Sequence, residues 1–335
     1  MKRNIYSFNG LIIHGLLALI FLFTYAGSKA QTTNVVMLKT LIGHTEPINC
    51  IAFSPDGKLI ASGSDEESLM SESGKFEIII WNIADGKILT SLRGHKNPIL
   101  SLAFNNNGTR LVSSDSKGDI KIWDIKNYSE IRTISGKDWI SSVCFTPDNK
   151  FILGEFTFKN RVGLWDANTG SLITFFDIKN QIGSMDISPD GSKIALSCYH
   201  QIQIWSLKSR QQLLSIDDNS VNGFAIRYSP NGKLLASGQG DGEIKIYDPN
   251  TLSIIFTLNG HFKPVLSISI NYDDKFMVSG SSDQMIKIWN LQTRTEVKSL
   301  VNEHKGTIKA VAFSPNSNLF ATAGEDKTVK IWQIK

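Results

Sequence analysis

Residues 260–290 read GHFKPVLSISINYDDKFMVSGSSDQMIKIWN, and this stretch contains the signals that decide the fold. Apolar residues alternate with small ones before Asn271, which is the period of two expected of a β-strand with two different faces. The run Asn271–Asp274 ends that strand, because Asn and Asp tolerate the backbone angles of tight turns. A second alternating run, Ile286–Trp289, follows another polar segment. The stretch therefore predicts short antiparallel strands joined by tight turns.

The same pattern recurs along the chain with a period near 42 residues. Its aromatic marker recurs at spacings of 40 to 43 residues and occupies Trp81, Trp123, Trp165, Trp205, Tyr247, Trp289 and Trp332. A turn marker in phase with the aromatic one begins at Ser54, Asn105, Thr146, Ser188, Ser229, Asn271 and Ser314. Four strand-like runs fall within each period. A repeat of this length predicts a single repeat architecture rather than two ordinary domains.

The repeat resembles that of the WD40 family. The Gly-His dipeptide of that family is matched at Gly43-His44, Gly94-His95 and Gly260-His261, and in part at Glu303-His304. The resemblance covers residues 35–335 and implies an all-β fold, a seven-bladed β-propeller with four strands per blade. Lys335 follows the last aromatic strand directly, whereas Val35–Leu41 has the pattern of an outer strand. We therefore expect the N-terminal strand to complete the last blade and close the ring.

Residues 1–30 have the layout of a secretory signal peptide, which leaves residues 31–335 for the propeller. Lys2 and Arg3 precede an apolar run over residues 11–26, and small residues follow where a signal peptidase cleaves. This layout predicts export to a periplasmic or extracellular location, with no membrane span after cleavage. The alternative is an uncleaved helix at residues 11–26 that anchors the protein in a membrane.

The charge balance argues against a nucleic-acid-binding surface. The 335 residues include 35 basic and 31 acidic side chains, and three of the basic ones but no acidic one lie in residues 1–30. The remainder of the chain therefore has a net charge of +1, too little for broad contact with phosphates. Cys50, Cys144 and Cys198 are odd in number and predict no disulfide framework. No cluster of His and Cys and no phosphate-binding loop is recognisable, so we expect neither a metal nor a cofactor.

The histidines of the repeat have a structural role in the WD40 family, where each is a partner of a Ser or Thr, an Asp and the Trp of the same blade. The resemblance implies two complete sets, His261, Ser279, Asp283 and Trp289, and His304, Thr322, Asp326 and Trp332. Hydrolases also combine Ser, His and Asp, but repetition of the set around a ring favours structure over catalysis. We therefore expect a protein that is not an enzyme and has no catalytic residues.

The third and fourth repeats lack this set. Glu155 and Ala195 stand in place of the Ser or Thr, and Lys159 and Tyr199 in place of the Asp. Aromatic and basic side chains, the usual components of binding hot spots, gather there instead. The predicted partner-binding residues are Trp139, Phe156, Phe158, Lys159, Arg161, Tyr199 and His200. The alternative is that both repeats diverged without gaining a function and that the aromatic side chains fill the space of the missing set.

These features favour an exported, monomeric propeller that acts as an interaction scaffold and binds a protein or peptide on the rim near blades 3 and 4. One alternative is an exported propeller enzyme, a hydrolase or lyase, with its site at the channel mouth, where the sequence offers Asp138, Asp186 and His200. Another is a structural component of the cell envelope that needs no ligand. Asp186 and Arg227 occupy matching positions on adjacent innermost strands, where they could pair across the channel.

Overall fold

The computed structural model describes residues 33–65, 76–217 and 223–335. The chain separates into two compact units, Met1–Thr32 and Thr33–Lys335, and the described residues belong to the second. The predicted signal peptide, and with it the alternative anchor helix at residues 11–26, lies outside the described residues. Within the part that is described, no helix is both long and apolar enough to cross a membrane.

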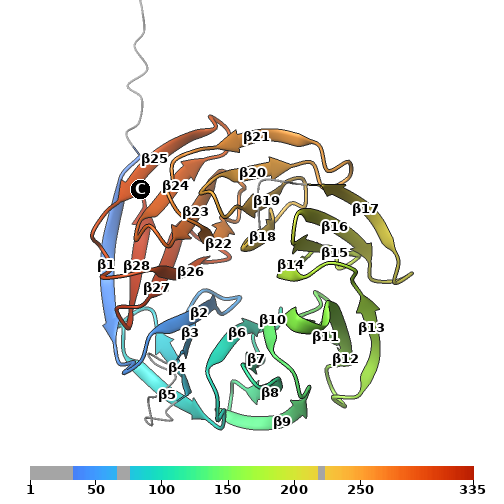
Figure 1. The fold of residues 1–335 in the computed structure, drawn as a ribbon. Coiled ribbons are helices and arrows are strands. Elements are labelled where there is room, and N and C mark those ends of the chain that lie inside the picture. The colour runs from blue at the N-terminus through green and yellow to red at the C-terminus, as the bar shows by residue number, and fades with distance from the viewer. Residues whose placement is uncertain (1–32, 66–75, 218–222) are drawn as a thin grey trace, which may run out of the picture. The chain divides into compact units, whose positions relative to one another are not determined.

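The described residues of the second unit form seven four-stranded antiparallel sheets, arranged as the blades of a ring (Figure 1). Blades 1 and 2 consist of β2 (Ile48–Phe53), β3 (Leu59–Ser64), β4 (Glu77–Asn82) and β5 (Ile88–Arg93), then β6 (Ile99–Phe104), β7 (Arg110–Asp115), β8 (Asp119–Asp124) and β9 (Ser129–Ser135). Blades 3 and 4 consist of β10 (Ile140–Phe145), β11 (Phe151–Phe156), β12 (Arg161–Asp166) and β13 (Leu172–Asp177), then β14 (Ile182–Ile187), β15 (Lys193–Cys198), β16 (Gln201–Ser206) and β17 (Gln212–Asp217). A single turn of 3-10 helix, Thr157–Lys159, joins β11 to β12.

The remaining three blades follow the same order from the channel outward. Blades 5 and 6 consist of β18 (Ala225–Tyr228), β19 (Leu235–Gly238), β20 (Ile244–Tyr247) and β21 (Ile254–Leu258), then β22 (Val265–Ile270), β23 (Phe276–Ser281), β24 (Ile286–Asn290) and β25 (Thr295–Leu300). Blade 7 consists of β26 (Ile308–Phe313), β27 (Leu319–Gly324), β28 (Thr328–Ile334) and β1 (Val35–Ile42). The seven-bladed all-β propeller predicted from the repeat is thereby confirmed.

The two ends of the described chain meet in blade 7. Strand β1 pairs antiparallel with β28, in a register that places Val35 opposite Ile334 and Ile42 opposite Thr328. Figure 1 shows β1 on the outer edge of this blade, beside β28. The N-terminal strand thus completes the last blade, as expected, and covers a sheet edge that would otherwise be open.

The ring is closed by contacts between the innermost strands of neighbouring blades. A hydroxyl on one inner strand often accepts a backbone N–H from the next: Ser101 Oγ lies 3.1 Å from Val143 N, and Ser267 Oγ lies 3.0 Å from Val311 N. This explains why small residues alternate with bulky ones on these strands, since a larger side chain would hold the neighbouring backbone away. Asp186 takes the same role in blade 4, where Oδ2 accepts the N–H of Tyr228 at 2.7 Å.

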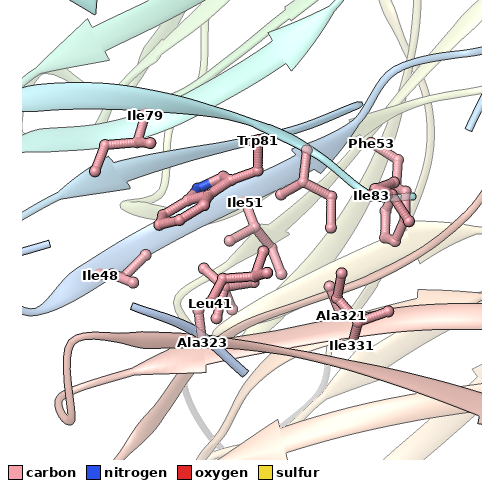
Figure 2. Close-up of a cluster of buried hydrophobic side chains, with 13 residues drawn as sticks. Leu41, Ile48, Ile51, Phe53, Ile79, Trp81, Ile83, Ala321, Ala323 and Ile331 are labelled. Carbon is pink, nitrogen blue, oxygen red and sulfur yellow. The ribbon is translucent and has the colours of Figure 1, made fainter. Parts of the chain in front are cut away.

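Apolar side chains fill the space between neighbouring blades. Figure 2 shows the cluster between blades 7 and 1, in which Leu41 from β1 and Trp81 from β4 are 3% and 1% exposed. Ile331 of β28 and Ile51 of β2 belong to the same cluster. Each blade therefore buries its apolar face against the next, and the rigidity of the ring comes from these repeated interfaces.

Candidate functional site

The histidine sets of blades 6 and 7 are hydrogen-bonded networks inside the sheets. In blade 6 the hydroxyl of Ser279 accepts the indole N–H of Trp289 at 2.8 Å and lies 2.8 Å from His261 Nε2. His261 Nδ1 in turn lies 2.8 Å from the carboxylate of Asp283. One arrangement of protons satisfies all these groups: the hydroxyl donates to Nε2, and the ring donates from Nδ1 to Asp283.

Blade 7 repeats the arrangement with a threonine in place of the serine. The hydroxyl of Thr322 lies 3.0 Å from the indole nitrogen of Trp332 and 2.8 Å from His304 Nε2. Asp326 accepts from His304 Nδ1 at 2.9 Å. Ser279 and Thr322 are both fully buried, so neither hydroxyl lies where a substrate could contact it. The geometry of the networks fits a structural role, in which each joins a loop on the rim to the strands beneath it.

A third complete network lies in blade 2, where the sequence pattern identified His95 and Trp123 but not the aspartate. His95 Nε2 lies 2.7 Å from Ser113 Oγ, and His95 Nδ1 lies 2.9 Å from the carboxylate of Asp115. Burial acts to raise the pKa of Asp115, but hydrogen bonds from His95 and from the backbone outweigh burial, and the pKa is lowered. The available signal was the spacing of Ser113 and Asp115, because residues two apart on a strand share one face.

The hairpins of blades 3 and 4 each differ by one residue from those of blades 2, 5, 6 and 7, which corrects the positions assigned from the sequence. Trp289 pairs with Met277, whereas Trp165 pairs with Ile152 and Trp205 with Ile194, so the hairpin is one residue longer in blade 3 and one shorter in blade 4. In this register the residues that replace the serine are Gly154 and Leu196. The assignment of Glu155 and Ala195 was wrong, because counting back from the tryptophan assumes equal hairpins.

Aromatic packing takes the place of the polar network in blade 3. Phe156 is 1% exposed, and its ring lies 5.9 Å from Trp165 and 5.8 Å from Phe175. The guanidinium of Arg161 lies 3.9 Å from the centre of the Phe175 ring. Phe156, one of the predicted partner-binding residues, is thus inside the blade. Arg161 is half-buried over it.

The other predicted residues lie at the surface, on the loops that join the strands at one rim. Trp139, Phe158 and Tyr199 are 38%, 69% and 50% exposed. Lys159 and His200 are exposed as well; Lys159 Nζ lies 3.9 Å from the carboxylate of Asp138, and the His200 ring lies 4.0 Å from that of Tyr199. The predicted set therefore divides into side chains that fill blade 3 and side chains that a partner could reach.

Three of the exposed aromatic residues line one groove of about 360 Å³ between the loops of blades 3, 4 and 5. The ring of Trp139 meets that of Phe158 edge to face, with centroids 5.8 Å apart. Tyr199 and Phe224 add apolar surface from blades 4 and 5. Phe224 is 39% exposed and is not among the partner-binding residues predicted from the sequence. The signal available for it was the absence of a Gly-His dipeptide before β18, which marks blade 5 as divergent too.

The acidic residues proposed for a channel-mouth enzyme are engaged with cations. Arg227 Nη1 lies 3.4 Å from Asp186 Oδ1, which is the pair expected across the channel. Asp138 faces Lys159, as described above. Burial is the main cause that raises the pKa of Asp186, and Arg227 opposes it. In the described ranges, no three His, Cys, Asp or Glu side chains are grouped as metal ligands would be.

Comparison with known proteins gives matches along most of the chain. The sequence profile of the WD domain, G-beta repeat, matches residues 36–69, 86–124, 128–166, 252–290 and 294–333. The profile of the WD40 domain of anaphase-promoting complex subunit 4 matches residues 187–269, which include most of blades 4 and 5. The matches together extend over all seven blades.

Several curated proteins are similar over the propeller. The transcriptional corepressor LEUNIG_HOMOLOG of Arabidopsis thaliana is 27% identical over 289 residues, which is 85% of this chain and 35% of the relative. The ribosome biogenesis protein YTM1 of Scheffersomyces stipitis is 25% identical over 314 residues, 88% of this chain and 65% of the relative. Striatin of Mus musculus is 24% identical over 332 residues, 88% of this chain and 41% of the relative. The chain thus spans between about a third and two thirds of these relatives.

The prediction of export is wrong by this comparison. Corepression of transcription and biogenesis of ribosomes are processes inside the cell, which does not fit a periplasmic or extracellular protein. The prediction depended on residues 1–30 alone, where two basic residues precede a short apolar run. Such a composition describes one segment and contains no information about the domain that follows it. The membrane-anchored and cell-envelope alternatives depended on the same segment and are set aside with it.

Proposed function

Because the chain belongs to the WD40 repeat family, we propose that it is a protein-interaction scaffold whose partner binds on the rim at blades 3 and 4. WD40 propellers act as platforms for protein partners, and the relatives of this chain include a corepressor and striatin. The proposal treats the ring as a rigid support and the divergent loops as the part that selects a partner.

The observation that supports this location is the groove lined by Trp139, Phe158, Tyr199 and Phe224. Four large aromatic side chains exposed around one hollow are unusual for a surface that only meets water, and such residues dominate binding energy in protein interfaces. The loops that present them are anchored on adjacent strands of three blades. A partner would therefore meet a surface that is already formed, which lowers the entropic cost of binding.

The closed ring also supports a monomer. Strand β1 covers the edge of blade 7, so no second copy is needed to complete a sheet. We expect light scattering of the purified protein to give the mass of one chain across a range of concentrations. A dimer whose mass persists on dilution would contradict this part of the proposal.

Site-specific cross-linking tests the location of the partner. A photoreactive amino acid placed at position 158, in the groove, should form a covalent adduct with one partner in cells. The same group at position 262 is the control, because Phe262 is 77% exposed on a rim loop of blade 6 but does not line the groove. Trp139→Ala should abolish the adduct at position 158. Adducts of equal yield at both positions, or an adduct insensitive to Trp139→Ala, would contradict binding at this groove.

A further inference from the structure

A buried carboxylate without a counter-charge lies under the groove. Glu155, near the end of β11, is fully buried. Its Oε1 lies 3.0 Å from the hydroxyl of Thr157, whereas Oε2 has no hydrogen-bond partner among the described residues. A buried acidic group is normally paired with a cation, since leaving its charge unpaired is costly. No cation among the described residues pairs with Glu155, so a positive group from outside the ring would meet an unpaired carboxylate.

Two hydroxyl groups connect Glu155 to the groove. The Thr157 hydroxyl lies 2.7 Å from that of Ser141, and both residues line the groove. Ser141 and Glu155 also line a cavity of about 180 Å³ at the central channel. Glu155 therefore lies between the groove and the channel, directly behind the two hydroxyls. When the hydroxyls donate their protons toward the carboxylate, their oxygen lone pairs face the groove.

The charges around Glu155 leave its carboxylate uncompensated. Burial raises its pKa to about 7, and only the hydrogen bonds of Ser141 and Thr157 act in the opposite direction. The basic residues at the channel are engaged elsewhere, Arg227 with Asp186 and Lys309 with Asp65. On the rim, Lys159 faces Asp138.

The thiol of Cys198 is a titratable group that interacts electrostatically with Glu155. Its pKa is raised to about 12, first by burial and then by the charge of Glu155. This thiol stays neutral at physiological pH and adds no positive charge. Of these two described groups, Glu155 has the pKa close to neutrality, so the arrival of a cation would favour its ionised form at physiological pH.

The walls of the groove suit the same ligand. Aromatic faces attract cations, and they also pack against the apolar stem of a long basic side chain. Trp139 and Phe158 stand on one side, and Tyr199 and Phe224 complete the lining from the next two blades. An ammonium group has three donors for the oxygens of Ser141 and Thr157. The planar guanidinium of an arginine is better matched to two adjacent carboxylate oxygens, and the groove does not offer such a pair.

We propose that the groove takes a lysine side chain of the partner, with its stem between the aromatic rings and its ammonium on the hydroxyls of Ser141 and Thr157, in front of Glu155. This inference rests on the proposed function, because it specifies the chemistry of the segment that binds on the rim. It also assigns Glu155 a role in recognition: its negative charge attracts the ammonium group, and the hydroxyls of Ser141 and Thr157 make the direct contact.

Fluorescence anisotropy with synthetic peptide pools tests the inference on the full chain. The pools are labelled hexapeptides with random flanks and a fixed central residue, which is lysine, arginine, norleucine or glutamate. Norleucine is the matched control, because it keeps the apolar stem and lacks the charge. We expect the lysine pool to bind at least about fivefold more tightly than the norleucine pool, which corresponds to about 1 kcal/mol. Equal binding of the two pools, or tighter binding of the arginine or glutamate pool, would overturn the inference.

Variants distinguish the contribution of the Glu155 charge to peptide binding from the contribution of the aromatic side chains. Glu155→Gln should remove the preference for lysine and leave norleucine binding unchanged, and Thr157→Val should weaken the preference. The preference in the unmodified protein should grow as pH rises through 7, because ionised Glu155 attracts the ammonium. The pH series is repeated with His200→Gln, since the His200 ring contacts that of Tyr199 edge to face at the rim. A preference for lysine that persists in Glu155→Gln contradicts the inference.

Trp139→Ala distinguishes failure of this inference from failure of the proposed function. Binding that Trp139→Ala weakens, but that is equal for lysine and norleucine, overturns the lysine assignment and leaves the scaffold proposal standing. Binding that is indifferent to Trp139→Ala overturns both. The absence of binding by every pool at about 1 mM protein also counts against both, because a weaker interaction would be too weak for a specific partner.

Discussion

The imidazole of His95 lies 2.9 Å from the carboxylate of Asp115, and both side chains are almost fully buried. In blade 6 the equivalent partner of His261 is Asp283, which follows the strand hydroxyl by four residues rather than two. The same network is thus built from a different position of the repeat. Asp115 also accepts the backbone N–H groups of Lys117 and Asp119, at 3.0 Å each.

We predict that Asp115→Ala lowers the free energy of unfolding by about 2–4 kcal/mol, because it strands His95 and two backbone N–H groups in a buried site. Lys117→Ala is the matched control, since Lys117 occupies the place in the repeat where blade 6 has its aspartate. The control should change the stability by no more than about 0.5 kcal/mol. Urea denaturation measures both variants, and equal losses would contradict the role of Asp115.

The ring could be predicted from the sequence, whereas the network around His95 and Asp115 could not. The period near 42 residues is visible because each blade repeats its own turn and tryptophan signals, which are local in the chain. Asp115 could not be recognised from the repeat pattern, because the aspartate of blades 6 and 7 lies four residues after the hydroxyl, whereas Asp115 uses a second position on the same strand face, two residues from Ser113. The altered lengths of the hairpins that carry Trp165 and Trp205 could not be recognised from the sequence either, because the spacing of the tryptophans does not show which residues pair across a hairpin.

The groove could not be predicted as a whole, because its walls come from three blades. Trp139, Tyr199 and Phe224 are separated by more than 20 residues from one another, and no local pattern joins them. Exposure also differs between near neighbours in sequence: Phe156 is buried and Phe158 exposed, although both were predicted to contact a partner. The two differ because Phe156 is the last residue of β11, whereas Phe158 lies in the 3-10 turn Thr157–Lys159 that leaves the strand.

Closure of the ring leads to a second prediction, which concerns β1. Deleting residues 31–42 should give an unstable or aggregating protein, because it removes the outer strand of blade 7 and exposes β28. Leu41→Ala is a milder test and should cost about 2–4 kcal/mol, since Leu41 is 3% exposed in the cluster of Figure 2.

The neighbouring residue supplies the control for β1. Ile42 is 75% exposed, so Ile42→Ala should change stability by no more than about 0.5 kcal/mol. Thermal melts and sedimentation compare the three variants. An unchanged melting temperature after deletion of residues 31–42 would contradict closure by this strand.

A third prediction concerns pH. The pKa of Glu155 is about 7 in the folded chain and near its ordinary value of 4.5 in the unfolded chain, because burial disfavours the carboxylate. The unfolded state therefore loses its proton first as pH rises, and the stability contributed by neutral Glu155 is lost between about pH 4.5 and 7. The loss should reach about 3 kcal/mol and then level off.

Glu155→Gln isolates this effect, because glutamine has a similar shape and does not titrate. The stability of the unmodified protein relative to Glu155→Gln should fall from pH 4.5 to pH 8. His44, whose pKa burial lowers to about 4, titrates in both proteins and cancels in the difference. Chemical denaturation at several pH values gives that difference, and a constant value would show that Glu155 is already compensated by a charge.

A pair of phenylalanines decides between a groove built for a partner and blades that merely diverged. Phe156→Ala should cost about 3–5 kcal/mol, because the ring is 1% exposed and packs on Trp165 and Phe175. Phe158→Ala should cost no more than about 0.5 kcal/mol, since 69% of its side chain is exposed, yet it should abolish partner binding. Both are measured by urea denaturation and by the cross-linking yield of a photoreactive group at position 199. If Phe158→Ala destabilised the fold as strongly as Phe156→Ala and left the cross-linking yield unchanged, the exposed aromatic residues would be packing elements and the rim at blades 3 and 4 would have no partner.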